Sequence, residues 1–484
     1  MLNMNHKTIT GTRLFTALLA ALLVCAGCAG SAGNAETSGT TENTSSPSSD
    51  ETTASLTSDD LPEKDFGGRE FRIFSRLNPW YHGNWLVEEA DGDVLNDAIY
   101  TRNSKVEDRY NITIKEILTD NAQKDFTKSV TAGDNSFDIG LLRMEWAFPI
   151  VLENGAMNWE DIPNLNLSQP WWVQGSLSSM SLMNNIYFAV SSFDVSHFES
   201  VRTFLFNKRM LDEYGLESPY ELVDSGKWTL EKFYQMAVSV STDLDSDGKW
   251  TKDDQYGLIG YSNVLCNTLM CGVGSILSIG KDNNDIPYFD LDQESYIDRL
   301  QTVSKLFEKK DGFVYTENKQ DIFRNGKALF LSCLLNEAAA LRDMEDDFGI
   351  LPAPKYNEAQ ENYINLGGSP FFMTVPITTP DKDRTGAVME ALAYDSMGLV
   401  DTAYYDIVLK GKASRDAESE KMLDLISSTL EYYHPLANSY LNSPLADNYI
   451  WKGKTDFASY FASVKDKIQS DIDTAMKTYR ENVG

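Results

Sequence analysis

Two stretches of the chain alternate between strand-like and helix-like apolar patterns, and this alternation is the strongest constraint on the fold. The first stretch shows strand, helix, strand, helix and strand patterns in turn at 71–74, 94–109, 112–117, 122–132 and 138–142. The second shows strand, helix, helix and strand patterns at 203–206, 208–214, 230–240 and 256–261. Strands that alternate with helices form parallel sheets with helices on their faces. The sequence therefore predicts an α/β protein built from two such units.

The last third of the chain adds further strands and one long helix. Strand patterns recur at 328–331, 348–351 and 371–375. Between Phe457 and Tyr479 apolar residues draw one stripe at helical spacing. Such a stripe is typical of an amphipathic helix that buries one face, so the chain is expected to end in a packed helix.

The N-terminus carries a short apolar run that ends in small residues and a cysteine. Leu14 to Val24 is apolar and is too short for a membrane span, which needs roughly 20 residues. A basic start, a short apolar run and small residues describe a secretory signal. The ending Ala26-Gly27-Cys28 resembles the lipobox of bacterial lipoproteins. We therefore expect residues 1–27 to be a lipoprotein signal peptide and Cys28 to be lipidated; an ordinary cleaved signal is the alternative.

The segment that follows has the composition of a tether. Residues 29–60 are almost entirely Gly, Ala, Ser, Thr, Asn, Asp and Glu and contain no aromatic residue. Such a segment cannot bury enough apolar surface to offset the entropy of the chain. We expect 28–64 to be a disordered tether that holds the folded part at the outer face of the bacterial cytoplasmic membrane.

Charge and cysteine content exclude several classes of function. The formal net charge is −30 at pH 7, which argues against nucleic acid as a partner because nucleic-acid binding needs basic patches. Outside the signal, the cysteines are Cys266, Cys271 and Cys333, and the whole chain has four histidines. A zinc site or a Ser-His-Asp triad is therefore not expected. Whether these three cysteines form a disulfide stays open.

Several motifs spread over nearly the whole ordered chain are similar to the family 1 extracellular solute-binding proteins of bacterial ABC importers. They are "DFGGREFRI" (65–73), "LNDAIYTRNSKVEDRYNI" (95–112), "NLNLSQPWW" (164–172), "FNKRMLDEYGL" (206–216), "GKWTLEKFYQMA" (226–237), "DFGILPAPKY" (347–356) and "KASRDAESEKMLDLI" (412–426). The resemblance implies a periplasmic-binding-protein-like fold of class II, like that of maltose-binding protein: two α/β lobes that close on a hinge like a clam. It further implies a carbohydrate ligand, the permease subunits of an ABC transporter as partners, and a monomer.

The same resemblance implies where the chain crosses between the lobes. The first crossing is expected near Ser191–Asp194, the second near Gly326 and the third near Pro376. These crossings divide the chain into a first lobe of 65–192 plus 327–376 and a second lobe of 193–326 plus 377–484.

Sugars present apolar C–H faces and hydroxyl edges, so a sugar site needs flat aromatic rings beside polar side chains. Three stretches have this mixture, "SRLNPWYHGNW" (75–85), "LLRMEW" (141–146) and "NYIWK" (448–452). The first two follow predicted strands, where α/β sheets place ligands. The candidate ligand-binding residues are Arg76, Trp80, Tyr81, Arg143, Glu145, Trp146, Asp194 and Trp451. Packing in the core is the alternative for each tryptophan, and a turn or helix cap is the alternative for Asp194. Trp171 and Trp172 are expected to pack.

An acidic loop, "DLDSDGKWTKDD" (243–254), matches most of a calcium-binding loop. Its predicted ligands are Asp243, Asp245, Asp247, the carbonyl of Lys249, and Asp254. Alternating carboxylates can curl around one hard cation, and Gly248 permits the sharp turn. A bound Ca²⁺ would be structural, and the alternative is a solvated acidic turn.

The leading interpretation is a binding protein without catalytic activity. The alternatives are a secreted glycoside-acting enzyme and a surface solute receptor that is not coupled to import. A glycosidase needs two carboxylates about 5–10 Å apart. With 72 acidic residues in the chain, such pairs carry no information, so the order of the motifs favours a binding protein.

Overall fold

The computed structural model describes residues 61–76, 85–275, 279–290, 293–308, 313–315, 319–413, 416–437 and 443–483. Cys28, Trp80 and Tyr81, each predicted to have a functional role, lie outside these ranges. No helix within them is long and apolar enough to cross a membrane.

The first sheet has five strands in the order β2-β1-β3-β13-β4. Their bounds are β1 (Arg69–Arg76), β2 (Ile112–Thr119), β3 (Ile139–Arg143), β4 (Phe188–Ala189) and β13 (Phe371–Thr374). β1 is parallel to β2 and β3, and β13 is antiparallel to β3 and β4. The expected βαβ unit is therefore present, and a strand from late in the chain extends it.

Three helices connect these parallel strands or follow them: α1 (Val94–Tyr110), α2 (Ala122–Ala132) and α3 (Met144–Leu152). The α1 helix begins where the Asp93 carboxylate accepts from the N–H groups of Leu95 and Asn96. It ends at Asn111, which adopts a left-handed φ of 48°. Local capping signals thus fix the bounds of this helix.

The second sheet also has five strands, in the order β11-β5-β10-β6-β9. Their bounds are β5 (Arg202–Asn207), β6 (Tyr256–Ile259), β9 (Val314–Tyr315), β10 (Ala328–Leu334) and β11 (Phe348–Leu351). β10 is parallel to β6 and antiparallel to β5, so the sheet is mixed. The helices around it are α6 (Lys208–Glu213), α7 (Pro219–Asp224), α8 (Leu230–Val240), α9 (Ser262–Gly272), α10 (Gln293–Lys305), α11 (Lys319–Arg324), α12 (Leu335–Ala340) and α14 (Ala417–Ser428).

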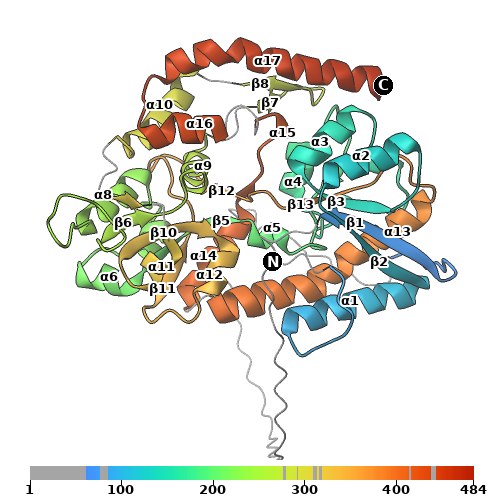
Figure 1. Ribbon diagram of the computed structural model, residues 1–484, viewed down its shortest axis with the longest axis horizontal. Helices are drawn as coiled ribbons and strands as arrows, with labels where there is room; N and C mark the ends of the chain where they lie inside the picture. Colours follow the sequence, from blue (N-terminus) through green and yellow to red (C-terminus); the bar gives the residue numbers. More distant parts are fainter. Residues whose placement is uncertain are drawn as a thin grey trace, which may run out of the picture. The chain divides into compact units, whose positions relative to one another are not determined.

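The remaining elements connect or cover the two sheets (Figure 1). They are η2 (Trp159–Asp161), α4 (Gln174–Met180), α5 (Ser196–Glu199), β7 (Ile279–Lys281), β8 (Pro287–Phe289), β12 (Asn365–Leu366), α13 (Lys382–Ser396), the π-helical η3 (Met397–Ala413), β14 (Leu430–Glu431), α15 (Pro435–Ala437), α16 (Ser443–Asn448), η5 (Ile450–Lys452) and α17 (Phe457–Asn482).

Buried aromatic side chains anchor the core of each lobe. Trp171 and Trp172 pack as expected: Trp172 is fully buried against Trp159 and donates its indole N–H to Glu390 at 3.1 Å. In the second lobe, the buried indole of Trp228 donates to the carbonyl of Pro352 at 3.0 Å. The indole N–H groups of Trp172 and Trp228 thus each have an acceptor, which avoids the cost of an unpaired buried polar group.

The expected lobe boundaries are wrong for part of the chain. Residues 327–376 were assigned to the first lobe, but β10 and β11 both pair with β5 in the second sheet. The predicted crossing near Gly326 is therefore wrong. Local apolar pattern identifies a strand but does not specify which neighbours accept its hydrogen bonds.

The crossing near Pro376 also differs from the expectation that 377–484 forms part of the second lobe. After β13, helix α13 packs against α1, and Arg384 donates to the Asp138 carboxylate at 2.5 Å. Residues 382–396 thus stay with the first lobe, because the buried Asp138 carboxylate needs this cation as well as Arg72.

In the part of the chain that the structure describes, three stretches of backbone pass from one five-stranded sheet to the other. The chain leaves the first sheet after β4 and enters the second at β5, so the 191–194 segment lies at a crossing, where it was expected. It returns through 367–370 to β13 and then crosses again through η3. Gly368 has a φ of 70°, and a Cβ there would lie 2.0 Å from the Ser200 carbonyl oxygen. Only glycine therefore allows these two crossing segments to lie so close.

Candidate functional site

The carboxyl ends of two neighbouring strands bring four predicted site residues together. Arg76 ends β1, and Arg143 ends β3. Glu145 and Trp146 lie in the first turn of α3, which begins directly after β3. The four residues meet because β1 and β3 are parallel neighbours, so their carboxyl ends share one edge of the sheet.

The indole of Trp146 is the centre of this group. The guanidinium carbon of Arg76 lies 5.3 Å from the centroid of the Trp146 ring, and that of Arg143 lies 5.7 Å from it. Both distances are within the range of cation–π attraction. Arg143 is also paired with Glu145 at 2.7 Å, whereas Arg76 is exposed. The site therefore combines the flat apolar ring of Trp146 with two guanidinium groups as hydrogen-bond donors and the carboxylate of Glu145 as an acceptor.

A cavity of about 540 Å³ opens beside this group. Its lining includes Arg76, Trp146, Asn121, Lys124 and Glu153. Asn121 precedes α2, and its side chain does not cap that helix, so backbone N–H groups at the helix start remain available as donors. The volume is in the range of a small-molecule site. The lining residues all belong to the first lobe and are mostly polar, so a ligand here would be recognised largely through hydrogen bonds.

The other two predicted site residues in the described ranges lie elsewhere. The Asp194 carboxylate is buried and accepts from the N–H of Ser196 at 3.1 Å and from its hydroxyl. These contacts are those of the turn alternative. Trp451 lies in η5, partly buried, with its ring 5.3 Å from that of Phe307. It is not part of the lining of the cavity at Trp146.

Tyr261 is a candidate that the sequence analysis missed. It follows β6, is 52% exposed, and has the ammonium of Lys319 at 4.5 Å from its ring centroid. Lys319 is buried and paired with Glu337 at 2.8 Å. The sequence pattern assigned 256–261 entirely to a strand. The strand ends earlier, at Ile259. An aromatic residue shortly after the end of a strand, as at Trp146, was the signal that could have identified Tyr261.

The acidic loop gathers three of its predicted ligands. Asp243, Asp245 and Asp247 each offer a carboxylate oxygen, and these oxygens lie within 4.8 Å of one another. The N–H of Asp247 lowers the pKa of Asp245, but desolvation and the Asp247 and Asp243 carboxylates outweigh it and raise that pKa. Such crowding of negative charge is relieved by a cation.

Of the other two predicted ligands, Asp254 has different partners, and the carbonyl of Lys249 stays a prediction. Asp254 accepts from the N–H groups of Leu244 at 2.9 Å and Thr251 at 2.7 Å, so it closes the loop rather than joining the three carboxylates. The ammonium of Lys249 lies 3.8 Å from Asp247.

A second set of charges is buried at the 191–194 crossing. The Arg102 guanidinium donates to the carbonyls of Trp85 and Phe193 at 2.8 and 2.9 Å and to the Ser396 hydroxyl at 3.1 Å. Burial lowers the pKa of Arg102 to about 9, although Asp194, Asp395 and Asp401 oppose this shift.

Burial disfavours the charged form of a side chain, so it raises the pKa of a carboxyl group and lowers the pKa of an imidazole. It raises the pKa of Asp194 to about 7 and that of Asp401 to about 8. It lowers the pKa of His197 to about 4. Burial thus brings the pKa values of the two carboxyl groups toward neutral pH and moves that of His197 away from it.

The arrangement of two α/β lobes joined by three crossings defines the class of the protein: it has the two-lobed periplasmic-binding-protein fold, as the sequence predicted. No protein-family model matches the chain, and no curated protein matches it. The likeness is to solved structures.

Three of these solved structures illustrate the likeness. The ABC substrate-binding protein Lmo0181 from Listeria monocytogenes, in complex with cycloalternan, has a TM-score of 0.53 and 12% identity, over 85% of this chain and 99% of that one. The maltose-binding protein MalE from Listeria monocytogenes, in complex with maltose, has a TM-score of 0.52 and 15% identity, over 86% and 98%. RafE from Streptococcus pneumoniae, in its apo form, has a TM-score of 0.53 and 12% identity, over 84% and 98%. At these identities the likeness establishes the fold.

Proposed function

We propose that this protein is the substrate-binding component of an ABC importer and captures a carbohydrate, in the form of an oligosaccharide, between its lobes. The observation that carries the proposal is the Arg76–Trp146–Arg143 group beside a cavity of about 540 Å³, at the sheet edge where this fold places ligands. Two of the similar solved structures are described in complex with cycloalternan and with maltose, which supports the same class of ligand here.

The chemistry of the group matches that of a sugar. The indole of Trp146 offers a flat surface for sugar C–H groups. Arg76 and Arg143 offer N–H donors to hydroxyl oxygens, and Glu145 offers an acceptor to hydroxyl groups. A sugar ring on Trp146 must share the indole with a guanidinium or displace it. We expect Arg76 to move, because Glu145 holds Arg143.

Residues outside this group belong to the proposal as further contacts. Trp80 and Tyr81 come shortly after Arg76 in the sequence, and Tyr261 presents an exposed ring after β6 of the other lobe. Trp451 and Asp194 stay predictions with weaker support, because the first packs on Phe307 and the second on Ser196.

The proposal includes the setting of the protein. We infer that Cys28 carries the lipid anchor, that the protein works as a monomer at the outer face of the cytoplasmic membrane, and that it delivers its ligand to the permease subunits. We also infer a structural Ca²⁺ held by Asp243, Asp245 and Asp247, because these carboxylates converge as a hard cation requires.

A screen of oligosaccharides by thermal shift tests the function. A ligand that binds the folded state alone raises the melting temperature by mass action. We expect at least one oligosaccharide to do so and to bind in titration calorimetry without being cleaved. The absence of binding across a broad screen would contradict the carbohydrate assignment, and turnover of a bound glycoside would indicate an enzyme instead.

A further inference from the structure

The C-terminal helix α17 contacts both lobes. It has 26 residues, which corresponds to a length of about 39 Å. One apolar stripe runs along it from Phe457 to Tyr479 and is buried over this length. In Figure 1 the helix, drawn in red, runs along α10, α16, β7 and β8. Its two ends have different partners.

The amino end of α17 is attached to the second lobe. The side chain of Gln301 in α10 donates to the Thr455 carbonyl at 3.2 Å, and the Ser304 hydroxyl donates to the Lys454 carbonyl at 2.6 Å. The rings of Tyr296 and Phe461 meet edge to face at 5.6 Å. Since α10 packs on α9, which contacts β5 and β10, this end moves with the second sheet.

The carboxyl end of α17 is attached to the first lobe. The hydroxyl of Tyr479 lies 2.7 Å from that of Tyr187, directly before β4, and accepts from the Asn185 amide at 3.2 Å. The amide of Asn482 donates to the Leu152 carbonyl at the end of α3, at 3.0 Å. Both tyrosines are buried, so their hydroxyls depend on each other and on Asn185 rather than on water.

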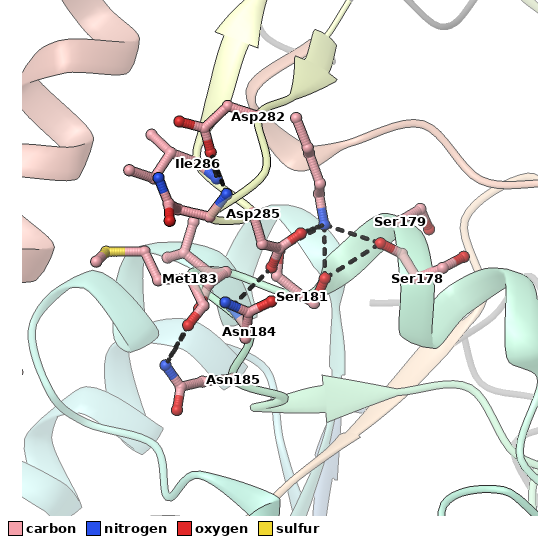
Figure 2. A network of polar contacts seen from close by, with 12 residues as sticks. Ser178, Ser179, Ser181, Met183, Asn184, Asn185, Asp282, Asp285 and Ile286 are labelled. Atoms are coloured by element: carbon pink, nitrogen blue, oxygen red, sulfur yellow. Dashed lines mark hydrogen bonds and ion pairs between the residues drawn. The ribbon is translucent and has the colours of Figure 1, made fainter.

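The hairpin of β7 and β8 adds a second attachment to the first lobe (Figure 2). The Lys281 ammonium donates to the carbonyls of Ser178 and Ser181 at 2.8 and 2.7 Å and to the Ser181 hydroxyl at 2.7 Å. It is also paired with Asp285 at 3.0 Å. Figure 2 shows Asp285 pointing toward Asn184, whose N–H donates to its carboxylate at 3.0 Å.

The hairpin and α17 act together because they are joined. The N–H of Phe289 in β8 donates to the side chain of Gln469 in the middle of α17, at 3.1 Å. Burial lowers the pKa of Lys281, and the hydrogen bond and the charge of Asp285 oppose this shift. Lys281 is four-fifths buried, so its ammonium depends on the acceptors of the first lobe for its solvation.

We propose that α17 and the 279–289 hairpin form a strap that stabilises the orientation of the two lobes seen here, so that hinge rotation requires release of the strap from the first lobe. Hinge motion moves lobes as rigid bodies. A rotation cannot preserve the contacts of a straight helix with α10 at one end and with Tyr187 and Leu152 at the other. The strap is a conformational device that is independent of which ligand the protein binds.

Interlobe distances measured by electron paramagnetic resonance test the strap. Spin labels are placed at Lys128→Cys on α2 and Ser239→Cys on α8, both exposed, in a chain whose Cys25 and Cys28 are serine. Cys266, Cys271 and Cys333 are buried and are expected not to react. The strap variants are Tyr479→Phe, which removes one hydroxyl, and Lys281→Met, which removes the ammonium but keeps an unbranched stem.

Each strap variant is expected to increase the fraction of molecules outside the parent distance peak at least about fivefold, because the net loss of even one hydrogen bond has an effect of this size and each variant removes more than one contact. The matched control is Lys477→Met, which removes an exposed cation paired with Glu481 on the same helix, and it is expected to leave the distribution unchanged. Cooperative melting of Tyr479→Phe verifies that this conservative variant folds. Distributions identical to the parent in both strap variants would overturn the proposal, as would an equal change in the control.

Discussion

Trp146 is the residue on which the proposed function depends most. Its indole has Arg76 and Arg143 as cation partners and lines the cavity at the end of β3. Stacking of a sugar on one aromatic ring contributes about 1 kcal/mol by analogy with aromatic pairs, so Trp146→Ala is expected to weaken carbohydrate binding five- to tenfold in titration calorimetry. Trp250→Ala is the matched control. Trp250 lies in the acidic loop of the other lobe, where its ring packs beside that of Tyr256. Equal affinity of the two variants would contradict the role of Trp146.

The buried acids at the 191–194 crossing predict a pH dependence of stability. Burial raises the pKa of Asp401 to about 8 and that of Asp194 to about 7, so the folded protein binds protons that the unfolded chain has lost. The stability that these groups contribute is therefore complete below the unfolded pKa of about 4 and is lost progressively as the pH rises to the folded pKa values of 7 to 8. The lowered pKa of His197 acts in the opposite direction, because its contribution to stability rises with pH up to the unfolded pKa of about 6.5 and levels off above it.

We therefore expect the free energy of unfolding to fall by an amount on the order of 1 kcal/mol between about pH 6.5 and 8, where His197 no longer opposes the loss, and to level off above pH 8. The melting temperature should fall with it. Asp401→Asn keeps a neutral side chain at all pH values, so it should flatten this slope. Asp424→Asn, a change of an exposed acid on α14, is the control and should retain the parent slope. The measurement is a series of thermal melts across this pH range, and a parent slope that persists in Asp401→Asn would contradict the assignment.

Among the elements, the acidic loop before β6 carries the next prediction. If Ca²⁺ joins Asp243, Asp245 and Asp247, its binding energy is part of the folding energy of the loop. A chelator is then expected to lower the melting temperature of the parent protein by several degrees and to have no effect on Asp245→Ala. Asp253→Ala changes an acid of the same loop that faces Lys327 instead, and it should retain the response to chelator. A melting curve that does not respond to chelator would leave the acidic-turn interpretation.

Most helices and strands could be predicted from the sequence, because their bounds depend on local signals. The patterns at 122–132 and 230–240 coincide with α2 and α8, and that at 348–351 coincides with β11. The partners of β10 and β11 could not be predicted. Almost all residues of both strands are buried, and such a continuous apolar pattern is compatible with a place in either sheet. The sequence identified Trp146 as a candidate because the end of β3 was recognised, and it missed the candidate Tyr261 because the strand pattern was extended too far.

At the scale of the whole molecule, two devices hold the lobes beyond the covalent crossings. The first is the buried Arg102, which joins α1 to the 191–194 crossing and to the end of α13. The second is the proposed strap, whose Tyr479 meets Tyr187 at 2.7 Å. Because the two sets of contacts involve different elements, we expect the Arg102 contacts and the proposed strap to restrain the hinge additively.

The proposed position of the folded unit in the cell rests on Cys28. The apolar run from Leu14 to Val24 is too short to span a bilayer, so the proposal assigns the anchoring to acyl chains at this cysteine. In the native host, Cys28→Ala is expected to move the protein from the membrane fraction to the medium, because the variant lacks the thiol that would carry the acyl chain. Immunoblots of both fractions measure this, and Ser31→Ala is the control that should stay membrane-bound. Retention of Cys28→Ala in the membrane fraction would contradict the lipid anchor, whereas metabolic labelling of the parent chain with a radioactive fatty acid, absent in the variant, would support it directly.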